Sequence, residues 1–86
     1  MKSIYNELLK YQKENNGSLL VSIGGFNDRA KRIILSDDES SICFYNEEGK
    51  EFYYFTVDEF DKSMSYEYDK KYQVLEILYN LEEMPF

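Results

Sequence analysis

Between residues 18 and 56, short apolar segments alternate with polar turns, and this alternation constrains the fold more than any other feature of the chain. Over residues 18–23, branched aliphatic side chains recur at every second position from Leu19, which is typical of a strand with one buried face. The glycine-rich segment 24–28 interrupts this pattern. Further strands are expected over residues 31–35, 41–46 and 51–56. The last two form a hairpin in which Gly49 supplies positive φ, so the sequence predicts four antiparallel strands.

Helical patterns flank the strand region. A helix is expected near the N-terminus, because Ser3 can cap it and apolar residues follow at i, i+4 and i+7 from Ile4. Gly17 is placed to end this helix in a left-handed conformation. Thr56 and Glu59 have the spacing of a capping box, so a short helix should run from there to about residue 64.

The last stretch of the chain predicts a second C-terminal helix. Its apolar residues form one broad helical stripe: Tyr68, Tyr72, Leu75, Leu78 and Tyr79. Glu67 and Lys71 also have the i, i+4 spacing of a stabilising ion pair. The expected fold class is therefore α+β, with an N-terminal helix, a four-stranded antiparallel sheet, and then a short and a long C-terminal helix packed on the sheet. A chain of 86 residues is expected to form a single domain over residues 1–86.

Four consecutive aromatic residues, 52–55, occupy the fourth expected strand. A sheet with one face in water should alternate apolar and polar residues, so this run places large aromatic side chains on both faces. One explanation is that the two terminal helices cover opposite faces, or that long neighbouring side chains cover a central strand. The other is an exposed Tyr/Phe patch used in recognition, with Tyr53 as a partner-binding residue.

Negative charge is concentrated in the second half of the chain. Residues 36–69 carry eleven acidic residues and two lysines, a net charge of −9, whereas residues 1–35 have a net charge of +3. A clustered negative field steers association with a positively charged partner. The candidate partner-binding acids are Asp37, Asp38, Glu39, Glu47, Glu48, Glu51, Asp58, Glu59, Asp61, Glu67 and Asp69. Four of them, Asp58, Glu59, Glu67 and Asp69, also suit the first turns of helices, and the other seven still cluster.

The residue inventory argues against catalysis and against cofactors. The chain has no histidine, so the commonest general base and metal ligand is missing, and its single cysteine, Cys43, is expected to be buried and inert. The acidic runs do not match the ligand spacing of a calcium loop, and no nucleophile motif is present. We therefore expect no enzyme activity, no catalytic residue, no metal site and no cofactor.

Charge and hydropathy also narrow the class of partner. A net charge of −7 opposes binding to nucleic acid and to anionic membranes. The longest uncharged apolar stretch, residues 18–26, has about half the length that a membrane-spanning helix needs. These features favour a protein partner and a cytoplasmic location in a bacterial cell.

The composition also indicates the kind of genome that encodes the chain. Amino acids with AT-rich codons fill 38 of 86 positions: Phe, Tyr, Met, Ile, Asn and Lys. This bias fits an AT-rich bacterium or a phage or mobile element that replicates in one.

The leading hypothesis is a small non-enzymatic inhibitor or adaptor encoded by a phage or mobile element. Its carboxylates would stand in for phosphates, as a nucleic-acid mimic, on the basic surface of a host nuclease or nucleic-acid-guided effector. By size, charge and expected architecture, the chain is similar to the general class of anti-CRISPR, anti-defence and DNA-mimic proteins, an analogy that transfers no residue. Two alternatives remain open: an immunity or antitoxin protein against a cationic nuclease toxin, and a structural protein that self-associates into a homodimer.

Overall fold

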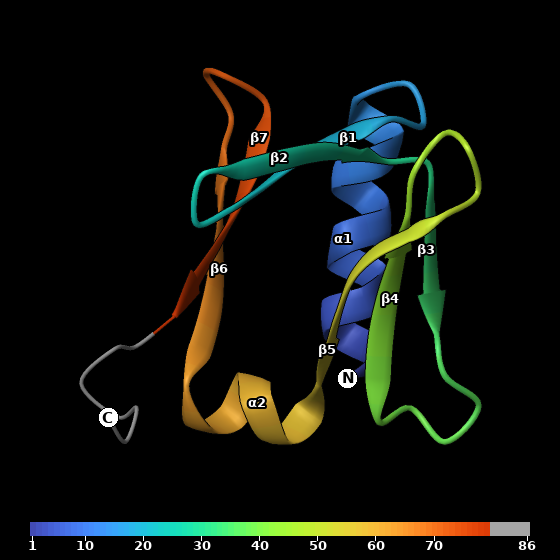
Figure 1. The fold of residues 1–86 in the computed structure, drawn as a ribbon, viewed down its shortest axis with the longest axis vertical. Coiled ribbons are helices and arrows are strands. Elements are labelled where there is room, and N and C mark those ends of the chain that lie inside the picture. The colour runs from blue at the N-terminus through green and yellow to red at the C-terminus, as the bar shows by residue number, and fades with distance from the viewer. Residues whose placement is uncertain (80–86) are drawn as a thin grey trace.

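In a computed structural model of the protein, which describes residues 1–79, two β-sheets and an N-terminal helix surround one core (Figure 1). The elements are α1 (Lys2–Glu14), β1 (Leu19–Ile23), β2 (Phe26–Ala30), β3 (Arg32–Leu35), β4 (Ser41–Tyr45), β5 (Glu51–Thr56), α2 (Val57–Lys62), β6 (Met64–Asp69) and β7 (Val74–Tyr79). The four-stranded sheet has the order β2-β1-β7-β6, and the three-stranded sheet has the order β3-β4-β5. Within residues 1–79, no helix is long and apolar enough to cross a membrane.

The chain passes between the two sheets twice, at Lys31 between β2 and β3 and through α2 between β5 and β6. The backbone N–H of Lys31 donates to the carbonyl of Tyr45 at 2.8 Å. In the four-stranded sheet β1 pairs with β2 and β6 pairs with β7 in antiparallel fashion, whereas β1 and β7 are parallel. The last described strand therefore lies beside the first strand, at the centre of the sheet.

The core lies between the inner faces of the two sheets and α1. It is wholly apolar among the buried residues: Leu8, Leu19, Val21, Ala30, Ile33, Ile42, Phe44, Phe55, Met64, Leu75 and Ile77. Leu8 is the only fully buried residue of α1, and Ile4, Tyr5, Leu9 and Tyr11 pack against the core beside it. Alternate residues of β4 and β7 are buried, as the two-residue period of a strand requires.

The prediction of a long C-terminal helix is wrong. Residues 64–69 and 74–79 form the antiparallel hairpin of β6 and β7, with Gln73 at a φ of 56° in the connecting turn. The apolar residues of this stretch fit a helical stripe and also a two-residue period. The strand period prevails because Leu75 and Ile77 are buried against β1 while Glu76 between them is exposed. Glu67 consequently lies opposite Glu76, and the expected helical pair with Lys71 does not exist.

The prediction of one four-stranded antiparallel sheet is also wrong, because residues 26–30 form an additional strand, β2. Gly24 and Gly25 adopt φ values of 54° and 92° and connect β1 to β2 as a two-residue hairpin turn. Two consecutive residues with positive φ are typical of the turns that join twisted antiparallel strands. The exposed polar residues of β2 obscured it in the sequence, because β2 lies at the edge of its sheet.

Several local predictions are confirmed. Strands occupy residues 19–23, 32–35, 41–45 and 51–56, and Gly49 has a φ of 80° in the turn between the last two. The short helix α2 is capped by Thr56, whose hydroxyl accepts from the backbone N–H of Glu59 at 3.2 Å. The cap of α1 differs, because the helix begins at Lys2 with Met1 as N-cap and Ser3 lies within it.

A β-bulge explains the four consecutive aromatic residues of β5. The register shifts so that Tyr53 pairs with Phe44 while Glu51 pairs with Tyr45, which leaves Phe52 as the extra residue. The rings of Phe52 and Tyr53 both lie 6.0 Å from the ring of Phe44, on the inner face. Tyr54 is the residue of the run that projects outward, with 53% of its surface exposed. Neither helices on opposite faces nor an extended aromatic patch is needed to account for the run.

Candidate functional site

Six of the candidate acids lie together at one end of the molecule. Ser41 pairs with Thr56 across β4 and β5, so the turn before β4 and the helix after β5 lie at the same end of that hairpin. The backbone N–H of Val57 donates to the carbonyl of Ser40 at 2.9 Å and links the two segments directly. Figure 1 shows this turn and α2 at the lower end of the long axis of the molecule. We call this group the acidic end; it consists of Asp37, Asp38, Glu39, Asp58, Glu59 and Asp61.

Hydrogen bonds fix the turn of the acidic end. The Asp38 carboxylate accepts from the hydroxyls of Ser36 and Ser40, at 2.8 and 2.6 Å, and from the Ser40 backbone N–H at 3.1 Å. These bonds, led by that of the Ser40 hydroxyl, hold the pKa of Asp38 below its ordinary value. Asp38 is therefore charged at neutral pH and has a defined orientation, whereas Asp37 and Glu39 beside it are exposed.

The helix of the acidic end presents its carboxylates in two ways. Asp58 and Asp61 are exposed, and Lys62 is the basic residue in the last turn of α2. Glu59 is half-buried and accepts a hydrogen bond from the Thr56 hydroxyl at 3.4 Å. Glu59 is thus partly committed to capping the helix, as Asp38 is to its turn, whereas Asp37, Glu39, Asp58 and Asp61 are exposed.

The turn between β4 and β5 lies at the opposite end of the three-stranded sheet. The five residues of β4, at about 3.4 Å per residue, place Glu47 and Glu48 about 17 Å from the acidic end. Glu51 follows at the start of β5, close to Cys43. Burial, and then the Glu51 carboxylate, raise the pKa of the Cys43 thiol. The structure thus separates these three acids from the acidic end.

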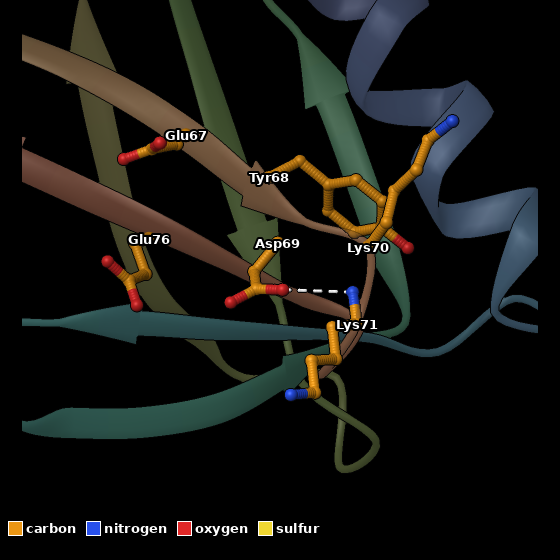
Figure 2. A pocket seen from close by; sticks show the side chains of 6 residues that line it. All are labelled: Glu67, Tyr68, Asp69, Lys70, Lys71 and Glu76. Atoms are coloured by element: carbon orange, nitrogen blue, oxygen red, sulfur yellow. Dashed lines mark hydrogen bonds between the residues drawn. The ribbon is translucent and has the colours of Figure 1, made fainter.

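The remaining two acids lie on the outer face of the four-stranded sheet. Glu67 and Asp69 alternate along β6 with Tyr66 and Tyr68, whose side chains contact the core. Glu67, Asp69 and Glu76 line a hollow of about 450 Å³ together with Tyr68 and two lysines of the hairpin turn. Figure 2 shows how these side chains lie. The Asp69 carboxylate accepts from the backbone N–H groups of Lys71 and Tyr72, at 2.9 and 3.2 Å. Asp69 therefore stabilises the turn between β6 and β7.

Tyr53 lies on the inner face and not on a free surface. Its hydroxyl is hydrogen-bonded to the hydroxyl of Tyr79 and donates to the Met64 sulfur at 3.7 Å. Burial is the main cause that raises the pKa of Tyr53 above its ordinary range. These contacts give Tyr53 a role in holding β5 against the β6–β7 hairpin.

A carboxylate at the junction of α1 and β6, that of Glu7, was not predicted from the sequence, because no local pattern marks it. Glu7 accepts hydrogen bonds from the hydroxyls of Tyr66 at 2.7 Å and Tyr11 at 2.9 Å. These bonds, that of Tyr66 first, lower the pKa of Glu7, whereas burial and the Glu7 contact raise the pKa of Tyr11 to about 12. The Tyr11 and Tyr68 rings are stacked with centroids 4.1 Å apart. Tyr11, Tyr66 and Tyr68 therefore attach α1 to the four-stranded sheet through these contacts.

The described part of the chain offers charged surfaces and shallow hollows. Within residues 1–79, no group of three or more His, Cys, Asp or Glu side chains is arranged to hold a metal ion. The raised pKa of Cys43 keeps that thiol protonated at neutral pH, which is the opposite of what a nucleophile requires.

Comparisons with protein-family models, with curated proteins and with solved structures found no match to the chain.

Proposed function

We propose that the protein is a small non-enzymatic inhibitor or adaptor, encoded by a phage or mobile element, that acts in the cytoplasm of a bacterial host. Its acidic end binds the basic, nucleic-acid-binding surface of a host protein, such as a nuclease or nucleic-acid-guided effector of a defence system. The observation that carries this proposal is the hydrogen bond from Val57 to Ser40, which joins two acidic segments that are far apart in the sequence.

Electrostatics supports this choice of partner. Six carboxylates at one end, with Lys62 beside them, create a concentrated negative field that attracts a Lys/Arg-lined groove. Such a groove normally binds phosphates through charge-assisted hydrogen bonds, which carboxylates can also accept. Binding should therefore weaken with added salt, as it does for a nucleic-acid ligand of the same groove.

A pull-down from a low-GC bacterial lysate in low salt, eluted with a salt gradient and analysed by mass spectrometry, tests the proposal. The expected result is one basic nucleic-acid-binding protein that salt releases. If this protein is a toxin encoded beside the gene, the function is that of an immunity protein that uses the same surface. Binding that salt leaves unchanged, or recovery of the protein itself alone, would contradict the proposal.

Matched variants locate the binding surface. Asp37→Lys with Asp61→Lys changes two exposed residues of the acidic end, and Glu47→Lys with Glu48→Lys makes the same change in net charge at the opposite end. The first variant should lose the partner, and the second should retain it. The reverse result would place the interface at the turn between β4 and β5.

A further inference from the structure

The Asn16-Gly17 dipeptide ends α1, and both of its residues have left-handed backbone conformations. Asn16 has a φ of 59° and Gly17 has a φ of 84°. The backbone N–H of Asn16 donates to the carbonyl of Lys13 at 3.2 Å, and that of Gly17 donates to the carbonyl of Gln12 at 2.9 Å. These two bonds are those of the Schellman motif, which satisfies the last carbonyls of a helix. Asn16 thus takes the position that glycine usually occupies in this motif.

The Gln12 side chain holds the same turn against the connection between β2 and β3. Its amide nitrogen donates to the carbonyl of Gly17 at 3.1 Å and to the carbonyl of Lys31 at 2.8 Å. A third acceptor, the carbonyl of Ala30, lies 3.4 Å from the same nitrogen. Gly17 is therefore held at its N–H by the backbone of Gln12 and at its carbonyl by the side chain of Gln12.

An asparagine followed by glycine brings a nucleophile and an electrophile together. Glycine has no side chain to shield its backbone nitrogen, which can therefore reach the carboxamide carbon of the asparagine before it. Asn16 is the one asparagine of the chain that precedes a glycine, and it is exposed to water. The dipeptide thus has the composition and the exposure that favour attack of the Gly17 nitrogen on Cγ of Asn16.

This reaction and the helix cap need the same N–H group. The Gly17 nitrogen gives its proton to a solvent base and forms a bond to Cγ of Asn16, and the bond from Cγ to Nδ2 breaks. The leaving nitrogen takes a proton from water and departs as ammonia, which leaves a five-membered succinimide in the chain. Water then opens one of the two imide carbonyls and gives aspartate or isoaspartate, with no oxidation or reduction. In the folded protein the Gly17 N–H is already donated to the carbonyl of Gln12.

We propose that Asn16 is a site of spontaneous deamidation, and that the C-terminal cap of α1 and the Gln12 side chain suppress the reaction in the folded protein. Attack requires the last turn of α1 to open, because the Gly17 N–H must first leave its acceptor. The change is permanent, since isoaspartate adds one atom to the backbone and alters the spacing of the two cap donors.

The site is independent of the proposed function. Asn16 and Lys31 line one hollow at the start of β3, whereas the acidic end follows the end of that strand. Deamidation adds one negative charge at the C-terminus of α1, where the helix dipole disfavours it. Salt-dependent binding through the acidic end and deamidation at Asn16 can therefore succeed or fail separately.

Peptide mass spectrometry of the full-length protein, incubated at mildly alkaline pH and compared with a sample digested before incubation, measures the reaction. The tryptic peptide of residues 14–29 contains Asn16 and also Asn27, an exposed asparagine followed by aspartate, which serves as an internal control. In the urea-unfolded protein Asn16 should deamidate faster than Asn27. In the folded protein Asn16 should react about tenfold more slowly than in urea, or slower still, because the hydrogen bonds of the cap must open first.

Three variants separate the chemistry of the dipeptide from its protection. Gln12→Ala removes the side-chain bonds to Gly17 and Lys31 and should accelerate the reaction of the folded protein about tenfold, since each lost bond changes the opening equilibrium several-fold. Lys10→Ala, at an exposed position of the same helix, is the matched control and should react like the wild type. Asn16→Gly removes the carboxamide and keeps a residue suited to positive φ, so residue 16 should not react and the Tm should not fall.

Several results would overturn the inference. Equal rates at Asn16 in the folded and the unfolded wild type would show that the cap gives no protection, and this comparison does not depend on any variant being folded. Faster reaction of Asn27 than of Asn16 in urea would refute the choice of site. Equal rates for the Gln12→Ala and Lys10→Ala proteins, both shown to be folded by circular dichroism, would exclude a role of Gln12.

Discussion

Substitution of Glu67 by lysine separates the strand pairing of β6 and β7 from a helical arrangement of the same residues. In the structure Glu67 faces Glu76, so Glu67→Lys replaces a repulsive cross-strand pair by an attractive one. In a helix the same change would replace the attractive i, i+4 pair with Lys71 by a repulsive one, which costs about 0.4–1 kcal/mol, twice the value of one pair. The two arrangements therefore predict opposite signs for the change in the free energy of unfolding.

The size of the effect follows from the geometry of the pair. Cross-strand pairs are worth about 0.2–1 kcal/mol each. Losing a repulsion and gaining an attraction would double this, but both side chains are exposed, and solvent screening reduces the sum to about 1 kcal/mol. For a domain of this size, 1 kcal/mol raises the Tm by about 4–8 °C.

Thermal unfolding followed by circular dichroism at pH 7 measures the effect. Glu48→Lys is the matched control, because it changes the net charge equally in an exposed turn. Glu67→Lys should have the higher Tm of the two in low salt, and the difference should shrink at 0.5 M salt. Adding Glu76→Lys should abolish the gain by restoring like charges. A Tm for Glu67→Lys below that of the control would refute the register of β6 and β7.

Three further predictions concern the core and the titratable groups. Phe44→Ala, which empties the centre of the aromatic cluster, should lower the free energy of unfolding in urea by about 3–5 kcal/mol, and a loss below 1 kcal/mol would contradict its burial. The pKa of Glu7 is lowered in the folded protein, chiefly by the hydrogen bond from Tyr66, so its contribution to stability is present above the unfolded pKa and is lost as pH falls through the folded pKa. Glu7→Gln should accordingly be less stable than the wild type at pH 7, and the difference should shrink as pH falls below the unfolded pKa and vanish below the folded pKa of Glu7. A difference in stability that pH leaves unchanged would argue against the bond. Cys43, whose pKa is raised by burial and by Glu51, should react with iodoacetamide at pH 8 more slowly than a free cysteine, and Glu51→Gln should accelerate the reaction; equal rates for the two proteins would exclude the influence of Glu51.

The candidate site could be predicted only in part from the sequence. The sequence identified the acidic residues and their concentration between residues 36 and 69. It left open whether these acids share one face, and the antiparallel pairing of β4 and β5 sends the turns at 36–40 and 46–50 to opposite ends. The direction in which a strand runs depends on its partner strands. Spacing along the chain therefore could not predict which of the distant acidic residues lie at the same end of the molecule.

The aromatic residues illustrate the same limit. Tyr66 and Glu7 are 59 positions apart, and their hydrogen bond exists because α1 packs on the sheet that contains β6. The bulge at Phe52 depends on the register between β4 and β5, in which Phe44 pairs with Tyr53. The run of four aromatic residues does not determine this register. Burial of Tyr53 is a consequence of that register.

Local sequence patterns were enough to predict four of the five strands within residues 18–56, the left-handed glycine turn at Gly49, the capped start of α2 and the polarised charge. Each of these depends on side chains within a few positions of one another, where period and turn chemistry are decisive. The hairpin of residues 64–79, in contrast, depends on long-range packing. Their apolar residues fit a helix as well as a strand, and the choice came from the parallel pairing of β7 with β1, about 50 positions away, which buries Leu75 and Ile77.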